Sequence, residues 1–386
     1  MPERNSTPVD CVTGVTVSSH HPRPGDFVEL SSFCDAFIRE ERSPGLALGI
    51  VRGDELVYCG GFGTMIVGDR TKLVSDDTIF HMSSLTKSVV ATAIMQLVET
   101  KKVILKGAVS RYLPYFRLAD SRYDSITILH LLTHTSGLPD VRDYFYEEHG
   151  DGDGALERHV RNLHELTLHH QPGAKFTYSS LGFDILGDVV SKASGRSFED
   201  YVEANILRPL NMNATALVSS TPAEDRLATG HSPDDTGAVV SVCRNPLNRS
   251  QAPSSGILSN VTDMARWIRL NLNHGELNGR RVLAASTHAM MWRPIVDTHR
   301  AGLCSGIGWF LTAVQDEYLV EHGGHSDGFI CHLTLLPNRR TGFVVMANYD
   351  YARILRVREQ VLKIVTGWEV IPPIRMTPLA DEASSR

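Results

Sequence analysis

The chain lacks the long apolar runs and basic blocks that are typical of membrane proteins and nucleic-acid-binding proteins. No segment of its 386 residues approaches the roughly 20 apolar residues that a transmembrane helix requires. The formal net charge is −6 and no Lys/Arg-rich block occurs, so no basic surface is expected for a phosphate backbone. We therefore expect neither a membrane nor a nucleic acid as a partner. With 42% hydrophobic and 21% charged residues, the chain can bury a large core.

Secretion and metal-binding signals are also missing. Residues 1–30 contain charge, proline and paired histidines, but no uninterrupted apolar segment followed by a cleavage site of small residues, so we expect a cytoplasmic location. The six cysteines form no CxxC pair, which favours reduced, mostly buried thiols. These cysteines are Cys11, Cys34, Cys59, Cys243, Cys304 and Cys331.

Strand-like segments occur near both ends of the chain. Apolar runs at 45–51 and 55–61, separated by a turn-like Arg-Gly-Asp tripeptide, predict an antiparallel hairpin. Near the C-terminal end, four β-rich runs occur at 308–314, 318–321, 329–336 and 342–348, and a helical segment follows at 354–365. Helix-like apolar spacing fills the middle, at 84–100, 127–133, 181–193, 198–206 and 262–273. We therefore expect an α+β fold in which both chain ends form one antiparallel sheet, with a mainly helical inserted lobe and a cleft between the lobes.

A serine and a lysine lie three residues apart at the start of a predicted helix. Residues three apart share a helix face, so Lys87 can bring its amine nitrogen to the Ser84 hydroxyl and take its proton. The helix N-terminus adds N–H groups where an oxyanion would form. Of the eight lysines, only Lys87 has serine three residues before it. The motif alone is more often a helix cap beside a solvated lysine, and both interpretations stay open at this point.

Further motifs follow in a fixed order along the chain. They are FHMSSLTK at 80–87, VSRYLP at 109–114, ITILHLLTHTSGLPD at 126–140, QPGAKFTYSSLGFDILG at 171–187, SSGILSNVTD at 254–263 and HGGHSDGF at 322–329. In this order the chain resembles the serine β-lactamase and penicillin-recognising superfamily. The similarity is to its class C-like branch, which also holds D-alanyl-D-alanine carboxypeptidases, esterases and a statin-side-chain acyltransferase.

The resemblance implies a β-lactamase/transpeptidase-like fold with a catalytic domain at 26–370. Its α/β lobe would span about 26–80 and 301–370, and its helical lobe about 81–300. Residues 1–25 and 371–386 would then be an N-terminal arm and a C-terminal tail.

The resemblance also implies roles for site residues. Tyr178 would shuttle the Ser84 proton, and the backbone N–H groups of Ser84 and His325 would form the oxyanion hole. Ser180, His322, Gly323 and Gly324 would contact the substrate. Ser180 stands where many relatives carry asparagine, and its shorter side chain cannot offer the donor and the acceptor of an amide together.

The third family motif also departs from the β-lactamase pattern. The usual Lys-Thr-Gly is replaced here by His322, Gly323 and Gly324. The lysine would supply a fixed positive charge to bind a substrate carboxylate, whereas a histidine is neutral over much of the physiological pH range. The two glycines allow a strand to approach substrate closely. No cofactor and no metal are implied.

These features predict a serine hydrolase that acts through a Ser84 acyl-enzyme on an ester or amide, with an esterase favoured. An acyltransferase that passes the acyl group to a small alcohol or amine, and a non-catalytic ligand-binding relative, stay open. The expected substrate is a small-molecule ester, amide or acyl-thioester, and the sequence leaves the oligomeric state open.

Three competing motifs are weaker. Residues 324–328 match the G-x-S-x-G elbow of α/β-hydrolases, but a strand rather than a helix is expected next and no histidine follows His332. His130 and His134 share a helix face without completing a zinc set, and we expect His134 to hold a loop by hydrogen bonds. Residues 150–154 resemble part of a calcium loop but lack its third acidic ligand and closing glutamate.

Overall fold

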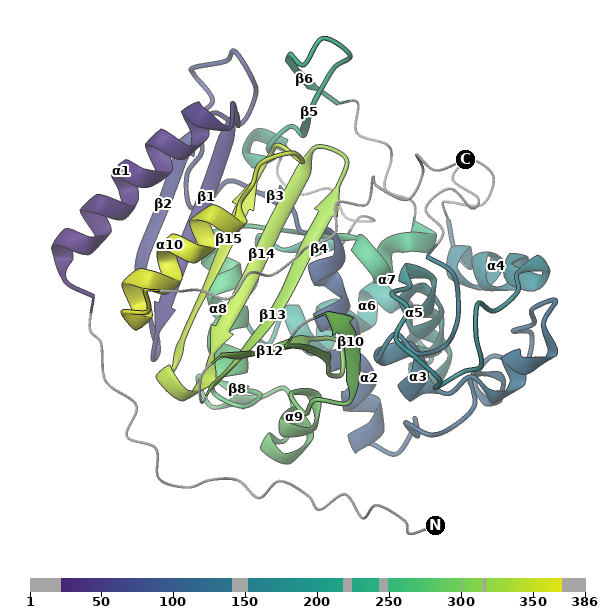
Figure 1. The fold of residues 1–386 in the computed structure, drawn as a ribbon. Coiled ribbons are helices and arrows are strands. Elements are labelled where there is room, and N and C mark those ends of the chain that lie inside the picture. Colours follow the sequence, from purple (N-terminus) through teal and green to yellow (C-terminus); the bar gives the residue numbers. More distant parts are fainter. Residues whose placement is uncertain are drawn as a thin grey trace, which may run out of the picture.

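An eight-stranded antiparallel sheet dominates the computed structural model, which describes residues 22–140, 152–217, 224–242, 249–300, 302–314 and 317–369 (Figure 1). The strand order is β10-β11-β12-β13-β14-β15-β1-β2. The strands are β1 Gly45–Arg52, β2 Glu55–Gly63, β10 Val296–Arg300, β11 Leu303–Ser305, β12 Phe310–Val314, β13 Glu317–Ser326, β14 Phe329–Leu336 and β15 Thr341–Ala347. Because β1 lies between β2 and β15, both ends of the chain meet in one sheet, as the sequence predicts.

The predicted N-terminal hairpin is confirmed, and its first strand is buried on both faces. β1 and β2 pair from Gly45↔Gly63 to Arg52↔Glu55, and Gly53 in the turn has a φ of 59°. Alternate β1 side chains enter two different cores, which explains why the strand is apolar throughout rather than alternating. Gly49 is needed there because a Cβ would lie 2.5 Å from Val261 Cγ1.

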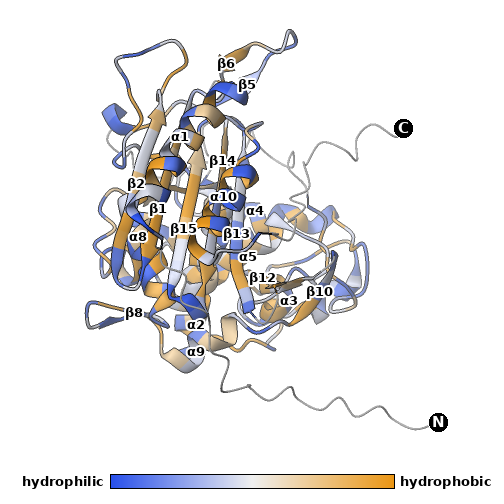
Figure 2. Cartoon of the chain, turned by 60° about the vertical axis from the view of Figure 1, so that its left-hand side comes forward, coloured by the Kyte–Doolittle hydropathy of each residue, from blue (hydrophilic) through white to orange (hydrophobic). Residues whose placement is uncertain are grey.

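Helices cover both faces of the sheet. α1 (Pro24–Glu40) and α10 (Leu355–Thr366) pack together on one face, and α8 (Val261–Leu272) packs on β1 and β15 from the other (Figure 1). Figure 2 shows that the strands of the sheet are mostly apolar, whereas the helices around it mix hydrophilic and hydrophobic residues. Helix α1 is not among the elements predicted from the sequence, and its first residues fall in the expected arm. Its signal was the spacing of Leu30, Cys34 and Phe37, which are all buried on the sheet side.

The remaining helices form the lobe beside the sheet. They are α2 Thr86–Glu99, α3 Ile128–Leu132, α4 Ala155–Asn162, α5 Ser180–Ser194, α6 Phe198–Val202, α7 Ala252–Ser255 and α9 Ala285–Met291. The short strands are β3 Phe80–His81, β4 Ala216–Leu217, β5 His231–Pro233, β6 Val239–Ser241, β7 Ile257–Ser259, β8 Glu276–Leu277 and β9 Arg280–Arg281. α5 packs against α2 and α7, so three segments distant in sequence converge behind Ser84. α8 and β10 fall within the range expected for the helical lobe, yet α8 packs on the sheet and β10 forms its edge.

The described cysteines are free thiols. Cys34 and Cys331 are buried, whereas Cys59 is exposed and Cys304 is intermediate, so burial is less general than expected. Cys11 and Cys243 lie outside the described residues, as does part of the segment at 150–154 that resembles a calcium loop. Within the described ranges, no helix has both the length and the apolar character needed to cross a bilayer.

Candidate active site

Ser84 lies in a tight turn between β3 and α2, at the centre of the short 3₁₀ helix η1 (Ser83–Leu85). Ser83 has a φ of 47°, a strained value for a residue other than glycine. The Thr86 hydroxyl donates to the Ser83 carbonyl over 2.6 Å and accepts from the Ile257 N–H at 3.0 Å. Because the Ser83 carbonyl and the Ser84 N–H share one peptide plane, these bonds also fix the direction of the Ser84 N–H.

Lys87 reaches Ser84 as the helical spacing predicts. Its Nζ lies 2.9 Å from Ser84 Oγ and 2.9 Å from the carbonyl oxygen of Ser254, and the side chain is 0% exposed. The Ser254 N–H in turn donates to Asp184 Oδ1 at 3.0 Å. Burial raises the pKa of the Asp184 carboxyl to about 7. Lys87 is therefore not a solvated helix lysine but a buried amine held against the serine hydroxyl.

Tyr178 comes from the loop before α5 and lies beside the Ser84–Lys87 pair. Lys87 Nζ is 5.1 Å from the centre of the Tyr178 ring. His134 holds this loop: its carbonyl accepts from the Thr177 N–H at 2.8 Å and its Nδ1 accepts from the Ser179 N–H at 3.2 Å. The His134 and Tyr178 rings stack with centroids 4.3 Å apart. The expectation that His134 fixes a loop by hydrogen bonds is confirmed, and the loop carries Tyr178.

Two histidines near Lys87 are held neutral. Burial and the Lys87 charge lower the pKa of His322 to about 3, and the same causes lower the pKa of His134 well below its usual value. His322 Nδ1 lies 2.7 Å from the Gly323 carbonyl, which can only accept, so Nδ1 carries the proton. Its buried Nε2 is an acceptor without a partner among the described residues. The site thus has a neutral acceptor at the position of the family's lysine.

Within the part of the chain that the structure describes, the β13 segment from His322 to Ser326 has no paired strand on its β12 side and forms an open edge. β12 pairs with β13 only from Glu317 to Glu321, while β14 covers the other side of β13 up to Ser326. Gly324 packs so closely on the nucleophile turn that a Cβ would lie 2.1 Å from the Met82 carbonyl oxygen. The His325 ring turns away to the carbonyl of Asp350, at 3.1 Å from Nε2. This arrangement is compatible with the predicted use of the His325 N–H, which stays a prediction.

Ser180 is the first residue of α5. Its backbone N–H donates to Asp140 Oδ1 at 2.8 Å, while the preceding Ser179 accepts from the Gly182 N–H as the helix cap. The contact of Ser180 with substrate stays a prediction. Asp184, Ser254 and Asp140 were not singled out from the sequence, because their contacts involve backbone groups and join segments that are distant in sequence.

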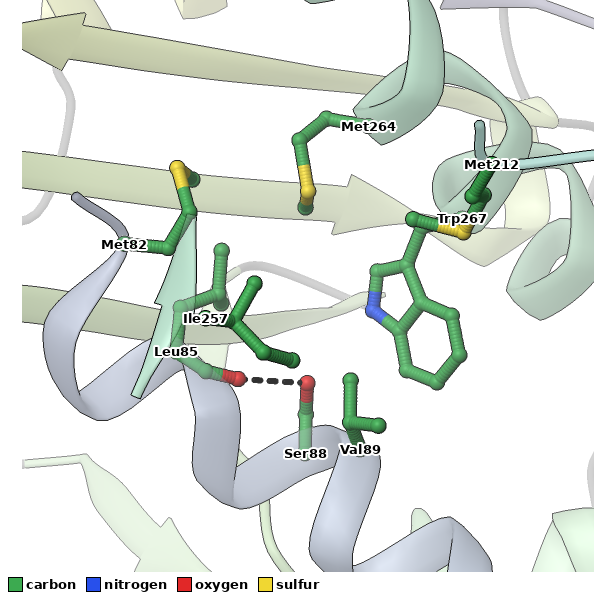
Figure 3. Close-up of a pocket in the computed structure, with 8 residues that line it drawn as sticks. All are labelled: Met82, Leu85, Ser88, Val89, Met212, Ile257, Met264 and Trp267. Carbon is green, nitrogen blue, oxygen red and sulfur yellow. Dashed lines mark hydrogen bonds between the residues drawn. The ribbon is translucent and has the colours of Figure 1, made fainter. Parts of the chain in front are cut away.

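An apolar cavity lies behind the nucleophile turn rather than at it (Figure 3). Ser84, Lys87 and Tyr178 do not line it, and its one hydroxyl, on Ser88, already donates to the Leu85 carbonyl at 2.8 Å. It is lined by Met82, Leu85, Ser88, Val89, Met212, Ile257, Met264 and Trp267. The described residues contain no cluster of three or more His, Cys, Asp or Glu side chains arranged to hold a metal ion.

Comparison with known proteins identifies the family of this chain. The family model described as Beta-lactamase matches residues 30–365, and the chain therefore belongs to the beta-lactamase family. It is similar to Protein flp of Staphylococcus aureus strain COL, with 27% identity over 324 residues that cover 83% of this chain and 63% of that protein. It is also similar to Penicillin-binding protein 4 of Amycolatopsis lactamdurans, with 28% identity over 336 residues, 84% of this chain and 86% of that protein.

Solved structures confirm the predicted fold. The octameric penicillin-binding protein homologue from Pyrococcus abyssi is 26% identical, with a TM-score of 0.76 and coverage of 89% of this chain and 78% of that one. SurE is 23% identical, with a TM-score of 0.74 and coverage of 93% and 81%, and shows similarity of fold alone. The chain spans only 63% of the length of the staphylococcal relative. Family and fold together therefore identify a beta-lactamase-family chain with a penicillin-binding-protein-like fold.

Proposed function

We propose that this protein is a serine esterase that works through an acyl-enzyme on Ser84. The observation that carries the proposal is the fully buried Lys87 amine 2.9 Å from Ser84 Oγ. A structural cap would not require a lysine to be desolvated against a serine hydroxyl, whereas activation of a nucleophile does. We also propose a cytoplasmic location, and this part of the proposal rests on the sequence alone.

The proposed reaction has two steps. The single proton of Ser84 Oγ passes to Tyr178, with Lys87 Nζ held beside both groups, as Oγ attacks the carbonyl carbon of the ester and forms a C–O bond. The oxyanion is stabilised by the N–H groups of Ser84 and His325, and the tetrahedral intermediate collapses as the alkoxide leaves with a proton returned through Tyr178. Water then attacks the acyl-enzyme, releases the carboxylic acid and restores the serine.

The neutral state of His322 supports an uncharged substrate. With a pKa of about 3, this ring supplies no positive charge to a substrate carboxylate at physiological pH. We therefore expect short p-nitrophenyl esters to react faster than penicillins. If an alcohol or amine is admitted in place of water, the same acyl-enzyme would serve an acyltransferase.

A covalent probe tests the proposal directly. A fluorophosphonate should add one phosphonyl group to the wild-type chain, mapped to Ser84 by intact-mass and peptide mass spectrometry, and none to Ser84→Ala. An ester and β-lactam panel, run with and without alcohol acceptors, then assigns the reaction. A folded wild-type chain without an adduct would show a non-catalytic relative, and faster turnover of penicillins than of esters would contradict the substrate class.

A further inference from the structure

A chain of side-chain hydrogen bonds joins the nucleophile turn to the end of β13. The Ser83 hydroxyl donates to Ser326 Oγ over 2.7 Å, and Ser326 Oγ lies 2.7 Å from His81 Nδ1. His81 Nε2 lies 2.6 Å from the carbonyl oxygen of Ser255. A carbonyl can only accept, so Nε2 carries a proton, and in the neutral ring Nδ1 accepts from Ser326. Donation therefore runs in one direction from Ser83 through Ser326 and His81 to Ser255.

The two serines of this chain are sequence neighbours of the two proposed oxyanion donors. Ser83 directly precedes Ser84, and Ser326 directly follows His325. The Ser83–Ser326 bond consequently spans the gap between the turn and the open edge of β13. The width of that gap decides whether both N–H groups can reach one oxygen atom.

Resting on the proposed function, we propose that His81, Ser83 and Ser326 are positioning residues that hold the two oxyanion-hole N–H groups at a fixed separation. Oxyanion donors act by being in place before charge develops, so a tie between their two backbone segments raises the rate without touching substrate. Ser83 is 0% and His81 is 4% exposed, and hydrogen bonds in such a low-dielectric environment are strong. Ser83 also needs support because its φ of 47° is strained.

Ser326→Ala removes this tie while leaving the buried Ser83 hydroxyl with another partner. Ser83 Oγ already lies 3.3 Å from His81 Nδ1 and can donate there when the Ser326 hydroxyl is absent. The variant is therefore expected to fold, because no buried hydroxyl is left unsatisfied. Ser326→Thr keeps the hydroxyl. Ser305→Ala is the matched control, because Ser305 is buried in the same sheet and donates to the neighbouring Gly306 carbonyl at 3.2 Å.

The experiment measures kcat and KM for a short p-nitrophenyl ester and for the thiono ester in which sulfur replaces the carbonyl oxygen. Ser326→Ala should lower kcat for the oxygen ester by about 10- to 100-fold with little change in KM. A misplaced oxyanion-hole N–H should lose part of the rate that is lost when such a donor is removed entirely. Sulfur is larger and accepts hydrogen bonds poorly, so a hole of fixed width favours oxygen. The oxygen-to-sulfur rate ratio should therefore fall in Ser326→Ala, and Ser326→Thr and Ser305→Ala should keep the wild-type ratio.

The outcomes separate this inference from the proposed function. An active wild type with an unchanged kcat and oxygen-to-sulfur ratio in Ser326→Ala would overturn the positioning role and leave the esterase proposal standing. An equal loss of both ester rates would also overturn it, because general loosening of the site does not discriminate between the two atoms. A folded wild type that neither turns over esters nor reacts with a fluorophosphonate would overturn the proposed function and this inference with it.

Discussion

Replacing Gly324 with alanine tests whether the close packing of β13 on the nucleophile turn is required for catalysis. The new Cβ would lie 2.1 Å from the Met82 carbonyl oxygen and 2.8 Å from Cys331 Sγ. A Cβ atom needs a separation of about 3.2 Å from a carbonyl oxygen, so β13 and the nucleophile turn must move apart by roughly 1 Å. A displacement of this size in an active site can lower the rate about 100-fold. We therefore expect kcat/KM for a short ester to fall about 100-fold.

The assay compares Gly324→Ala with Gly25→Ala, after thermal unfolding has shown that both are folded. Gly25 lies in the first turn of α1, where an added Cβ would meet nothing within 4 Å, so alanine there should leave activity unchanged and stability equal or higher by about 0.5–1 kcal/mol. Overpacking at Gly324 should cost about 1–3 kcal/mol of the free energy of unfolding. A folded Gly324→Ala enzyme with wild-type kcat/KM would refute the reasoning.

Three further changes test other parts of the structure. Tyr178→Phe should lower kcat for esters by orders of magnitude without changing the melting temperature, and wild-type kcat would exclude the proton shuttle. Glu321→Gln should lower the free energy of unfolding in urea by about 3–5 kcal/mol, because it leaves the buried Arg358 guanidinium, 2.7 Å away, without its counter-charge. Glu276→Gln, which removes a charge from an exposed ion pair, should lower it by less than about 1 kcal/mol. Burial raises the pKa of Asp184 to about 7 from its ordinary 3.8, so the folded state binds one more proton than the unfolded state between these values. Wild-type stability should therefore fall with rising pH in that range, by at most about 1.4 kcal/mol per pH unit. Urea midpoints measured across that range should lack this slope in Asp184→Asn, and parallel wild-type and variant curves would contradict the assignment.

Local patterns in the sequence were enough to predict the elements that carry the site. Apolar spacing and turn residues within single segments predict three of these elements. They are the hairpin at β1 and β2, the helix α2 that carries Lys87 just after the Ser84 turn, and α5 directly after Tyr178. The same spacing also marked α1, but the segment was not recognised among the polar residues around it. The ordered motifs, rather than any one pair, identified the family that the comparisons confirm.

The environment of those residues was decided only by the tertiary structure. Asp184 is linked to Lys87 by hydrogen bonds through the backbone of Ser254. Ser326 is hydrogen-bonded to Ser83, which lies 243 positions away in the chain. Hydrogen bonds of this kind depend on which segments pack together, and no spacing rule within one segment predicts them. Sequence by itself therefore determined the reactive groups Ser84, Lys87 and Tyr178 as candidates, because they belong to local motifs. Burial of Lys87, neutrality of His322 and the close approach of β13 required the fold, because desolvation and contact distance are properties of packed segments rather than of residue order.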